Sequence, residues 1–145
     1  MTLPLRPALP SDIHGLFYVR TAVVENALTA PELEALGITE EAVAEMISAS
    51  PCAWVVTEAE RIVGFSMIIP EDACLFAAFV LPEFEGRGIG KRLVSVAEAA
   101  LFDQHRTIWL ETGMDTRAAD FYRYLGWHGE TPVGEGDIRL EKHRP

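Results

Sequence analysis

The sequence predicts an α+β fold: a three-layer α/β/α sandwich whose central sheet is mixed, mostly antiparallel, and flanked by helices. Two observations lead to this prediction. Short runs rich in β-branched and aromatic residues follow one another between polar turns over residues 53–80, which indicates consecutive antiparallel strands. The pattern then changes to strand, helix, strand over residues 75–112, which indicates one right-handed parallel crossover at a glycine-rich turn.

Two helices are predicted in the N-terminal third. Ser11 or Asp12 can cap a first helix, whose apolar positions continue at roughly helical spacing as far as Val24. Residues 31–37 contain proline and glycine and are expected to break this helix. A second helix is expected to start at Thr39.

The remaining elements follow from periodicity and from turn residues. A helix is predicted over residues 88–103, because its apolar residues fall on one side. Asp115 or Thr116 can cap a final helix, which Gly126 ends. Strands are predicted at residues 3–8, 53–56, 62–69, 75–80, 107–112 and 138–142.

Length and composition predict one domain spanning residues 1–145, since 49% of the residues are apolar and 23% are charged. No apolar run approaches the roughly 18 residues that span a bilayer, and the first residues do not resemble a signal peptide. We therefore expect a cytoplasmic protein without a membrane partner. The formal net charge of -10 argues against nucleic-acid binding. Cys52 and Cys74 lack the spacing of a metal site or a disulfide framework, so buried thiols are expected.

Residues 80–92 carry the clearest chemical pattern, a strand end that runs through a glycine-rich turn into a helix. Unpaired N–H groups and the dipole at a helix N-terminus favour an anion such as a diphosphate. Two familiar phosphate-binding motifs are excluded. Lys91 stands where a dinucleotide-binding GxGxxG motif has its third glycine, and Arg92 stands where a P-loop has Ser or Thr. Taken alone, the turn is equally explained by a tight connection without a ligand.

The turn resembles the acetyl-CoA signature of the GNAT acetyltransferase superfamily, Q/R-x-x-G-x-G/A, which reads here Glu85-Gly86-Arg87-Gly88-Ile89-Gly90. Glu85 departs from the first position of that signature. A later segment is similar to the family pattern N-x-x-A-x-x-F-Y-x-x-x-G-F, and its matching positions are Asp115, Ala118, Phe121, Tyr122, Gly126 and Trp127. Asp115 and Trp127 depart from that pattern.

The resemblance implies acetyl-CoA as co-substrate and no metal. The cofactor residues that it implies are Phe79, Val80, Glu85, Gly86, Arg87, Gly88, Ile89, Gly90, Lys91 and Asp115. A backbone N–H near Phe79 or Val80 is expected to meet the charge that develops on the thioester oxygen. The positive charges of Arg87, Lys91 and Arg92 can offset the acidic side chain of Glu85. Asp115 lacks the amide donor of the family's Asn, so its alternative role is that of a helix cap.

The resemblance also implies two catalytic residues. Tyr122 matches the family's general acid, and its alternative is an aromatic core residue on the apolar helix face. Glu111, at the end of a predicted strand, is the leading candidate for general base, and its alternative is a solvated carboxylate. Glu71, Asp72 and His14 remain open as other bases.

The implied function is acetyl transfer to a primary amine of a small molecule or of a peptide or protein, by direct attack in a ternary complex. The alternatives are a non-catalytic acyl-CoA-binding regulatory module and an interaction protein with the same fold. Family members build the acceptor pocket from segments that correspond to residues 18–44 and 127–140, and they commonly form homodimers. Possible partners for the amine in the first segment are Glu25, Asn26, Glu32, Glu34, Glu40 and Glu41.

Overall fold

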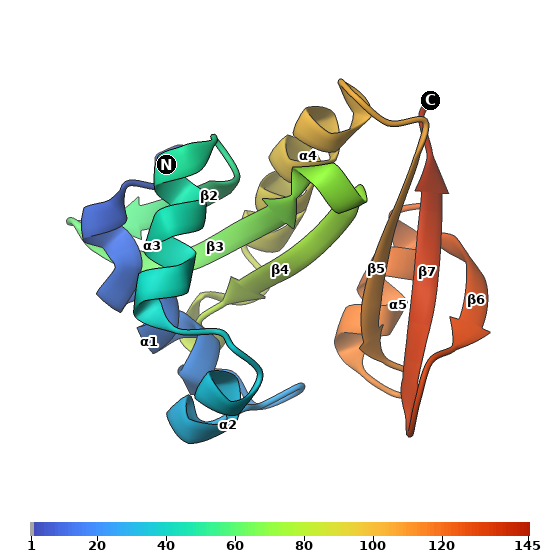
Figure 1. Ribbon diagram of the computed structural model, residues 1–145, viewed down its shortest axis with the longest axis horizontal. Coiled ribbons are helices and arrows are strands. Elements are labelled where there is room, and N and C mark those ends of the chain that lie inside the picture. Colours follow the sequence, from blue (N-terminus) through green and yellow to red (C-terminus); the bar gives the residue numbers. More distant parts are fainter. Residues whose placement is uncertain (1) are drawn as a thin grey trace.

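The computed structural model describes residues 2–145, which form a seven-stranded sheet in the order β1-β2-β3-β4-β5-β7-β6 (Figure 1). The strands are β1 Leu5–Pro7, β2 Ala53–Glu58, β3 Arg61–Ile69, β4 Cys74–Val80, β5 Thr107–Gly113, β6 His128–Pro132 and β7 Asp137–His143. Among the described strands, only β4 and β5 pair in parallel, and every other neighbouring pair is antiparallel. The predicted mixed sheet with one parallel crossover is therefore confirmed.

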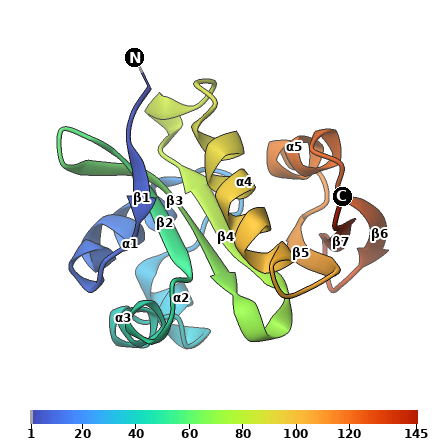
Figure 2. The same ribbon diagram turned by 90° about the horizontal axis from the view of Figure 1, so that it is seen from above.

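In the part of the chain that the structure describes, five helices cover the sheet: α1 Ile13–Ala22, α2 Ala30–Ala35, α3 Glu40–Ala49, α4 Ile89–Phe102 and α5 Arg117–Tyr124. Figure 2 shows α1 to α3 on one side of the sheet and α4 with α5 on the other, which is the predicted three-layer arrangement. Short 3₁₀ turns lie at Pro10–Asp12, Pro70–Asp72 and Pro82–Phe84. Within residues 2–145, no helix combines the length and the apolar character needed to cross a membrane.

The prediction that residues 31–37 only break a helix is wrong, because α2 lies there. Thr29 caps α2 by accepting a hydrogen bond from the backbone N–H of Glu32, and the Glu32 carboxylate accepts one from the N–H of Thr29. Pro31 falls in the first turn, where a missing N–H costs nothing. The sequence signal for α2 was the capping box Thr-x-x-Glu, formed here by Thr29 and Glu32. It marks a helix start, and proline in the first turn does not break the helix.

Two further predictions at element ends are corrected. The first helix ends at Ala22, and Val24 beyond it is 77% exposed instead of lining the helix. The sequence predicted one C-terminal strand, whereas the structure has a β6–β7 hairpin. All five residues of β6 are exposed, so this strand has no apolar alternation by which it could be recognised.

The N-terminus of α4 is held against the sheet by a close approach at Gly64 of β3. A Cβ atom at Gly64 would lie 3.1 Å from Leu93 Cδ1, 3.2 Å from the Phe79 carbonyl oxygen and 3.3 Å from Ile89 Cγ2. Any other residue here would require these neighbours to move by a few tenths of an ångström, so glycine suits the close approach of α4. As a result, the first turn of α4 begins directly beyond the end of β4.

The sheet opens between its two parallel strands. β4 and β5 are paired only at Cys74 and Trp109, where the Trp109 N–H donates to the Ala73 carbonyl at 3.0 Å. Beyond that point the two strands diverge, as Figure 1 shows. The facing backbone edges of residues 75–80 and 110–113 therefore have no partner strand. The register of β4 against β3 also skips Phe76, which forms a bulge beside the opening.

Candidate functional site

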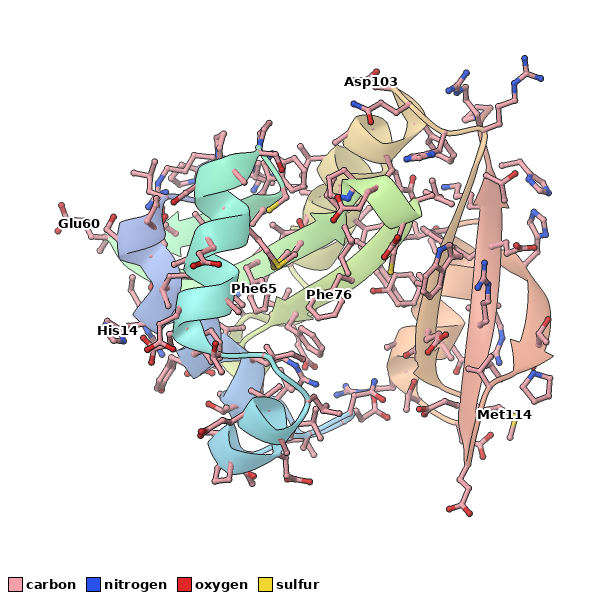
Figure 3. All side chains as sticks on the ribbon, viewed as in Figure 1. His14, Glu60, Phe65, Phe76, Asp103 and Met114 are labelled. Atoms are coloured by element: carbon pink, nitrogen blue, oxygen red, sulfur yellow. The ribbon has the colours of Figure 1, made fainter. Side chains whose placement is uncertain are left out.

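A cavity of about 420 Å³ lies where β4 and β5 diverge, and it continues under α1 to α3. Its walls are mostly apolar: the N-terminal helices and the segment that joins them contribute Leu16, Phe17, Leu28, Leu33, Ile38 and Val43. The polar or charged residues of the lining include Arg20, Asn26, Glu111, Thr112, Tyr122 and Asp137. In Figure 3, Phe65 and Phe76 mark the side of the cavity formed by β3 and β4. An apolar chamber with a few convergent polar groups is typical of a small-molecule site.

The predicted glycine-rich turn lies between β4 and α4, and the backbone N–H groups at its helix end have no acceptor among the described residues. Gly86 and Gly88 have φ angles of +76° and +79°, which side-chain-bearing residues rarely adopt. Gly88 is the N-cap of α4, and the first intrahelical bond runs from the Arg92 N–H to the Gly88 carbonyl. The N–H groups of residues 89–91 consequently have no acceptor among the described residues. This arrangement can bind phosphate groups.

Glu85, the residue that departs from the family signature, is neutralised by a residue of another helix. Its carboxylate lies 3.2 Å from Arg117 Nη1, at the start of α5. The backbone N–H of Arg117 also donates to the carboxylate of Glu25, at 3.0 and 3.2 Å. The structure thus adds Arg117 to the cations expected to offset Glu85. Arg92 instead donates to the Leu3 carbonyl, on the N-terminal strand side.

Tyr122 lies on α5, is only 7% exposed and lines the cavity. Its ring stacks edge-on against Trp127 with 5.9 Å between centroids, and Trp127 Nε1 donates to Glu98 at 2.9 Å. Tyr122 is therefore both a core aromatic residue and a cavity residue. Its hydroxyl makes no hydrogen bond within residues 2–145. Burial, and secondarily the nearby charge of Glu98, raises the pKa of Tyr122, so the hydroxyl stays protonated and able to donate.

Asp115 does not cap the last helix. Thr116 does so, because its Oγ1 accepts from the Ala119 N–H at 3.1 Å. Asp115 is exposed and does not line the cavity. The helix-cap alternative for Asp115 is therefore wrong, and its predicted contact with the cofactor stays a prediction.

Glu111 lies on β5 with an exposed side chain and lines the cavity. Its cross-strand partner is Arg139, but the Arg139 guanidinium lies over the Trp109 ring, 4.2 Å from the centroid. No cation of the described chain lies within 4 Å of the Glu111 carboxylate. The side chain is therefore available to accept a proton in the cavity.

The other candidate bases lie away from the cavity lining. His14 pairs with Glu40, with Nδ1 3.0 Å from Oε1, and Figure 3 shows it on the outer edge of the molecule. Glu71 and Asp72 are on the 3₁₀ turn before β4, at the end of β4 opposite the glycine-rich turn. Of the four proposed bases, the structure places only Glu111 in the cavity.

Several acidic residues considered as amine partners have structural roles instead. Glu25 binds the first N–H of α5, and Glu32 belongs to the capping box of α2. Asn26 lines the cavity and joins two distant segments, since its Oδ1 accepts from the Gly113 N–H at 3.2 Å. Its backbone has a φ of +56°. The segment that follows α1 is thereby tied to the end of β5.

Arg20 was not identified from the sequence, although a signal was present. It follows Leu16 by four residues and Phe17 by three, so it lies on the apolar face of α1. A charged residue at such a position is unusual and indicates a buried partner or a ligand. Asp137 at the start of β7 also lines the cavity, and it falls within the range expected for the acceptor pocket.

Within residues 2–145, no group of three His, Cys, Asp or Glu side chains is arranged to hold a metal ion. Cys52 and Cys74 are both buried and not joined in a disulfide. Burial, then the charges of Glu111 and Asp72, raises the pKa of Cys74 to about 12. Its thiol is therefore protonated and unreactive at neutral pH.

Comparisons with known proteins agree with this geometry. The family described as acetyltransferase (GNAT) domain matches residues 49–128, more than half of the chain, and this segment includes the glycine-rich turn, β4, β5 and α5. A comparison with curated protein sequences gives no match.

Solved structures of low sequence identity share the fold over the whole chain. The PaiA N-acetyltransferase from Thermoplasma acidophilum in complex with coenzyme A has a TM-score of 0.77 at 17% identity, with 99% of this chain and 100% of that chain covered. A GCN5-related N-acetyltransferase from Rhodopseudomonas palustris has a TM-score of 0.76 at 21% identity, with 99% and 97% covered. A ribosomal-protein-alanine N-acetyltransferase from Brucella melitensis has a TM-score of 0.72 at 19% identity, with 98% and 100% covered.

Proposed function

Because the chain belongs to the GNAT acetyltransferase family, and is therefore an acetyl-CoA-dependent acyltransferase, we propose that it is an N-acetyltransferase acting on a primary amine of a small molecule or of a peptide or protein. The observation that carries this proposal is the continuity of the site. The turn with free N–H groups at residues 89–91 leads into the opening between β4 and β5, and that opening leads into the chamber that contains Glu111 and Tyr122.

The residues present fit acetyl-CoA. The N–H groups of the turn suit its diphosphate, and the left-handed glycines hold them in position. The unpaired edges of β4 and β5 suit an extended arm that carries amide groups, since such an arm can bond to a free strand edge. The bound co-substrate supplies an acetyl thioester, and a backbone N–H near Phe79 or Val80 can stabilise charge on its oxygen.

Two side chains complete the proposed reaction, which is a direct attack in a ternary complex. Glu111 accepts a proton from the acceptor amine, because an alkyl ammonium with a pKa of roughly 10 cannot attack a carbonyl until it is neutral. The amine nitrogen then bonds to the acetyl carbon, the carbon–sulfur bond breaks, and Tyr122 donates its proton to the leaving sulfur. The second proton on the new amide nitrogen is lost to solvent, from which Tyr122 regains its own, so the protons balance. The raised pKa of Tyr122 keeps its hydroxyl protonated at neutral pH, so that a donor is present beside the leaving sulfur.

The proposal is tested by titrating the purified protein with acetyl-CoA in a calorimeter and then measuring thiol release against a panel of amines. Binding followed by amine-dependent thiol release is expected. Binding without release on any amine would favour the non-catalytic acyl-CoA-binding module. An absence of binding would favour the interaction protein and refute the proposal. A cytoplasmic location, a single domain and a homodimer remain predictions.

A further inference from the structure

Arg20 is a cation of the cavity that has no anionic partner within residues 2–145. It stands near the end of α1, half-buried, and lines the chamber. Its guanidinium carbon lies 4.3 Å from the centre of the Phe79 ring, and Nη1 donates to the Asn26 carbonyl at 3.0 Å. The other guanidinium nitrogens, Nε and Nη2, make no hydrogen bond within residues 2–145. The stacking and the Nη1 bond hold the group in place while leaving donors free.

Among the described residues, Arg20 lacks a counter-ion inside a cavity, although the chain carries 22 acidic residues against 12 basic ones. No carboxylate oxygen of residues 2–145 lies within 4 Å of the Arg20 guanidinium. Arginines that do have a carboxylate within that distance are Arg6, Arg61, Arg117, Arg123 and Arg139. The remaining arginines without one, Arg87, Arg92, Arg106 and Arg144, do not line the cavity. Burial lowers the pKa of Arg20, which means that its charge has lost water without gaining an anion.

We propose that Arg20 binds a carboxylate of the acceptor, so that the substrate is a small amino acid with a free amine, a free carboxylate and an apolar side chain. This inference rests on the proposed N-acetyltransferase function and narrows it. Glu111 and Asp137 are acidic residues of the same cavity and suit the ammonium group of such a substrate. The apolar residues of α1 to α3 suit its side chain.

An amine without a carboxylate is a poorer match for this chamber. It would displace water from Arg20 and leave a desolvated cation without an acceptor, which opposes binding. An acceptor with a carboxylate instead forms charge-assisted hydrogen bonds with the planar guanidinium, which favours two parallel bonds. The unpaired cation therefore acts as the specificity determinant of the pocket.

The test compares each amino acid with its amide, because the pair differs only in the carboxylate. Suitable pairs are alanine with alaninamide, leucine with leucinamide, and phenylalanine with phenylalaninamide. Each compound is titrated into the CoA-loaded protein, and its kcat/KM is measured with acetyl-CoA. For at least one pair, we expect the acid to bind about tenfold to a hundredfold more tightly, the range set by hydrogen bonds to a charged group. The amine of the amide is less basic than that of the amino acid, so a larger fraction of it is neutral and reactive at neutral pH. Intrinsic reactivity therefore favours the amide in kcat/KM and cannot explain a preference for the acid.

Arg20→Gln is expected to remove the preference for the acid while leaving the CoA dissociation constant within about twofold of the wild type. Arg20→Lys should restore part of the preference, because it keeps the charge without the planar pair of donors. The control is Arg106→Gln, which removes the same charge from an exposed site outside the cavity and should change neither quantity. Circular dichroism on each variant verifies folding.

Four outcomes would overturn the inference. One is equal binding, or no binding, of acid and amide in every pair. Another is a preference for the acid that survives in Arg20→Gln. The third is a loss of CoA affinity in Arg20→Gln, which would assign Arg20 to the phosphates of the co-substrate. A wild-type protein that transfers acetyl groups only to amines lacking a carboxylate would refute the inference and keep the proposed function. A protein that does not bind CoA would refute the proposed function itself.

Discussion

The glycine-rich turn and the chamber under α1 to α3 belong to one cleft, but they are built differently. The turn is a contiguous segment, residues 85–91, that offers backbone N–H groups held in place by two left-handed glycines. The chamber is assembled from residues of α1 to α3, β3, β4, β5, α5 and the start of β7, and of the segment after α1, which are far apart in the sequence. The turn therefore suits a co-substrate common to a family, whereas the chamber can change its acceptor by single substitutions.

The two regions also differ in how they tolerate charge. The turn lies on the surface, where water and Arg117 reduce the effect of the acidic Glu85. In the chamber, burial lowers the pKa of Arg20 and raises the pKa of Tyr122. The gain or loss of one charge there should therefore change binding and catalysis much more than a charge change in the turn. Substitutions in the two regions should consequently separate cofactor binding from chemistry and from acceptor selection.

The largest effect is expected from Tyr122→Phe, which removes only the hydroxyl. Loss of a general acid should lower kcat by about 10²–10⁴-fold, with acetyl-CoA affinity almost unchanged. The matched control is Tyr124→Phe on the same helix. The Tyr124 side chain is 82% exposed, so this variant should change neither kcat nor acetyl-CoA affinity. Steady-state kinetics and calorimetry of both variants check this prediction.

The pH dependence of wild-type activity gives a second test of the proposed role of Tyr122 as proton donor. Since burial raises its pKa above the ordinary value of about 10, the hydroxyl remains a proton donor throughout the neutral and mildly alkaline range. Activity should therefore not fall between pH 7 and 10 through ionisation of this residue. A fall in that interval that disappears in Tyr122→Phe would contradict the assignment.

Gly88→Glu should have the next largest effect and act only on the turn. It forces a side chain into a left-handed conformation and adds a negative charge where phosphate is expected, so acetyl-CoA should bind roughly a hundredfold more weakly. Gly134→Glu is the control, because Gly134 also has a positive φ, open space around it and a place on a surface turn. Both variants should lose similar unfolding free energy, and only the first should lose CoA affinity. Equal CoA affinity in the two would exclude the turn as the phosphate site.

The turn could be predicted residue by residue, whereas most of the chamber could be assigned only to the ranges 18–44 and 127–140, for a physical reason. Gly86 and Gly88 act through local backbone geometry, so their spacing within one segment carries the information. The same holds for α4 and α5, whose apolar faces and caps are local signals. The fold class followed from the alternation between strand and helix patterns.

The chamber depends on contacts between distant segments. Asn26 bonds to Gly113, and Glu25 bonds to Arg117, across more than eighty residues in each case. Nothing in the local pattern reveals such pairs, so Asn26 could only be grouped with other polar residues. Arg20 was detectable as a charge on an apolar helix face, but its lack of a counter-ion could be seen only in the structure.

Glu111→Gln should have a smaller effect, confined to the proton transfer. At neutral pH, turnover should fall by about tenfold, and the deficit should shrink as the pH rises toward the pKa of the acceptor amine, because deprotonation by solvent then replaces the carboxylate. The measurement is the ratio of wild-type to variant kcat/KM from pH 6.5 to 9.5. Glu135→Gln, in the exposed β6–β7 turn, is the control. A ratio that does not change with pH would make Glu111 a binding residue.

The smallest effect is expected from Asn26→Gly, which tests whether the segment after α1 must be tied to β5. Glycine keeps the positive φ without strain but loses the hydrogen bond from the Gly113 N–H, so the unfolding free energy should fall by about 1 kcal/mol. Because the Asn26 carbonyl also orients Arg20, KM for the acceptor should rise about threefold while CoA affinity is retained. Asn26→Ala should cost more stability than Asn26→Gly, since alanine adds the strain of the left-handed backbone. If both variants instead weakened CoA binding and left the acceptor KM unchanged, this segment would belong functionally to the turn, and the two regions would not be independent.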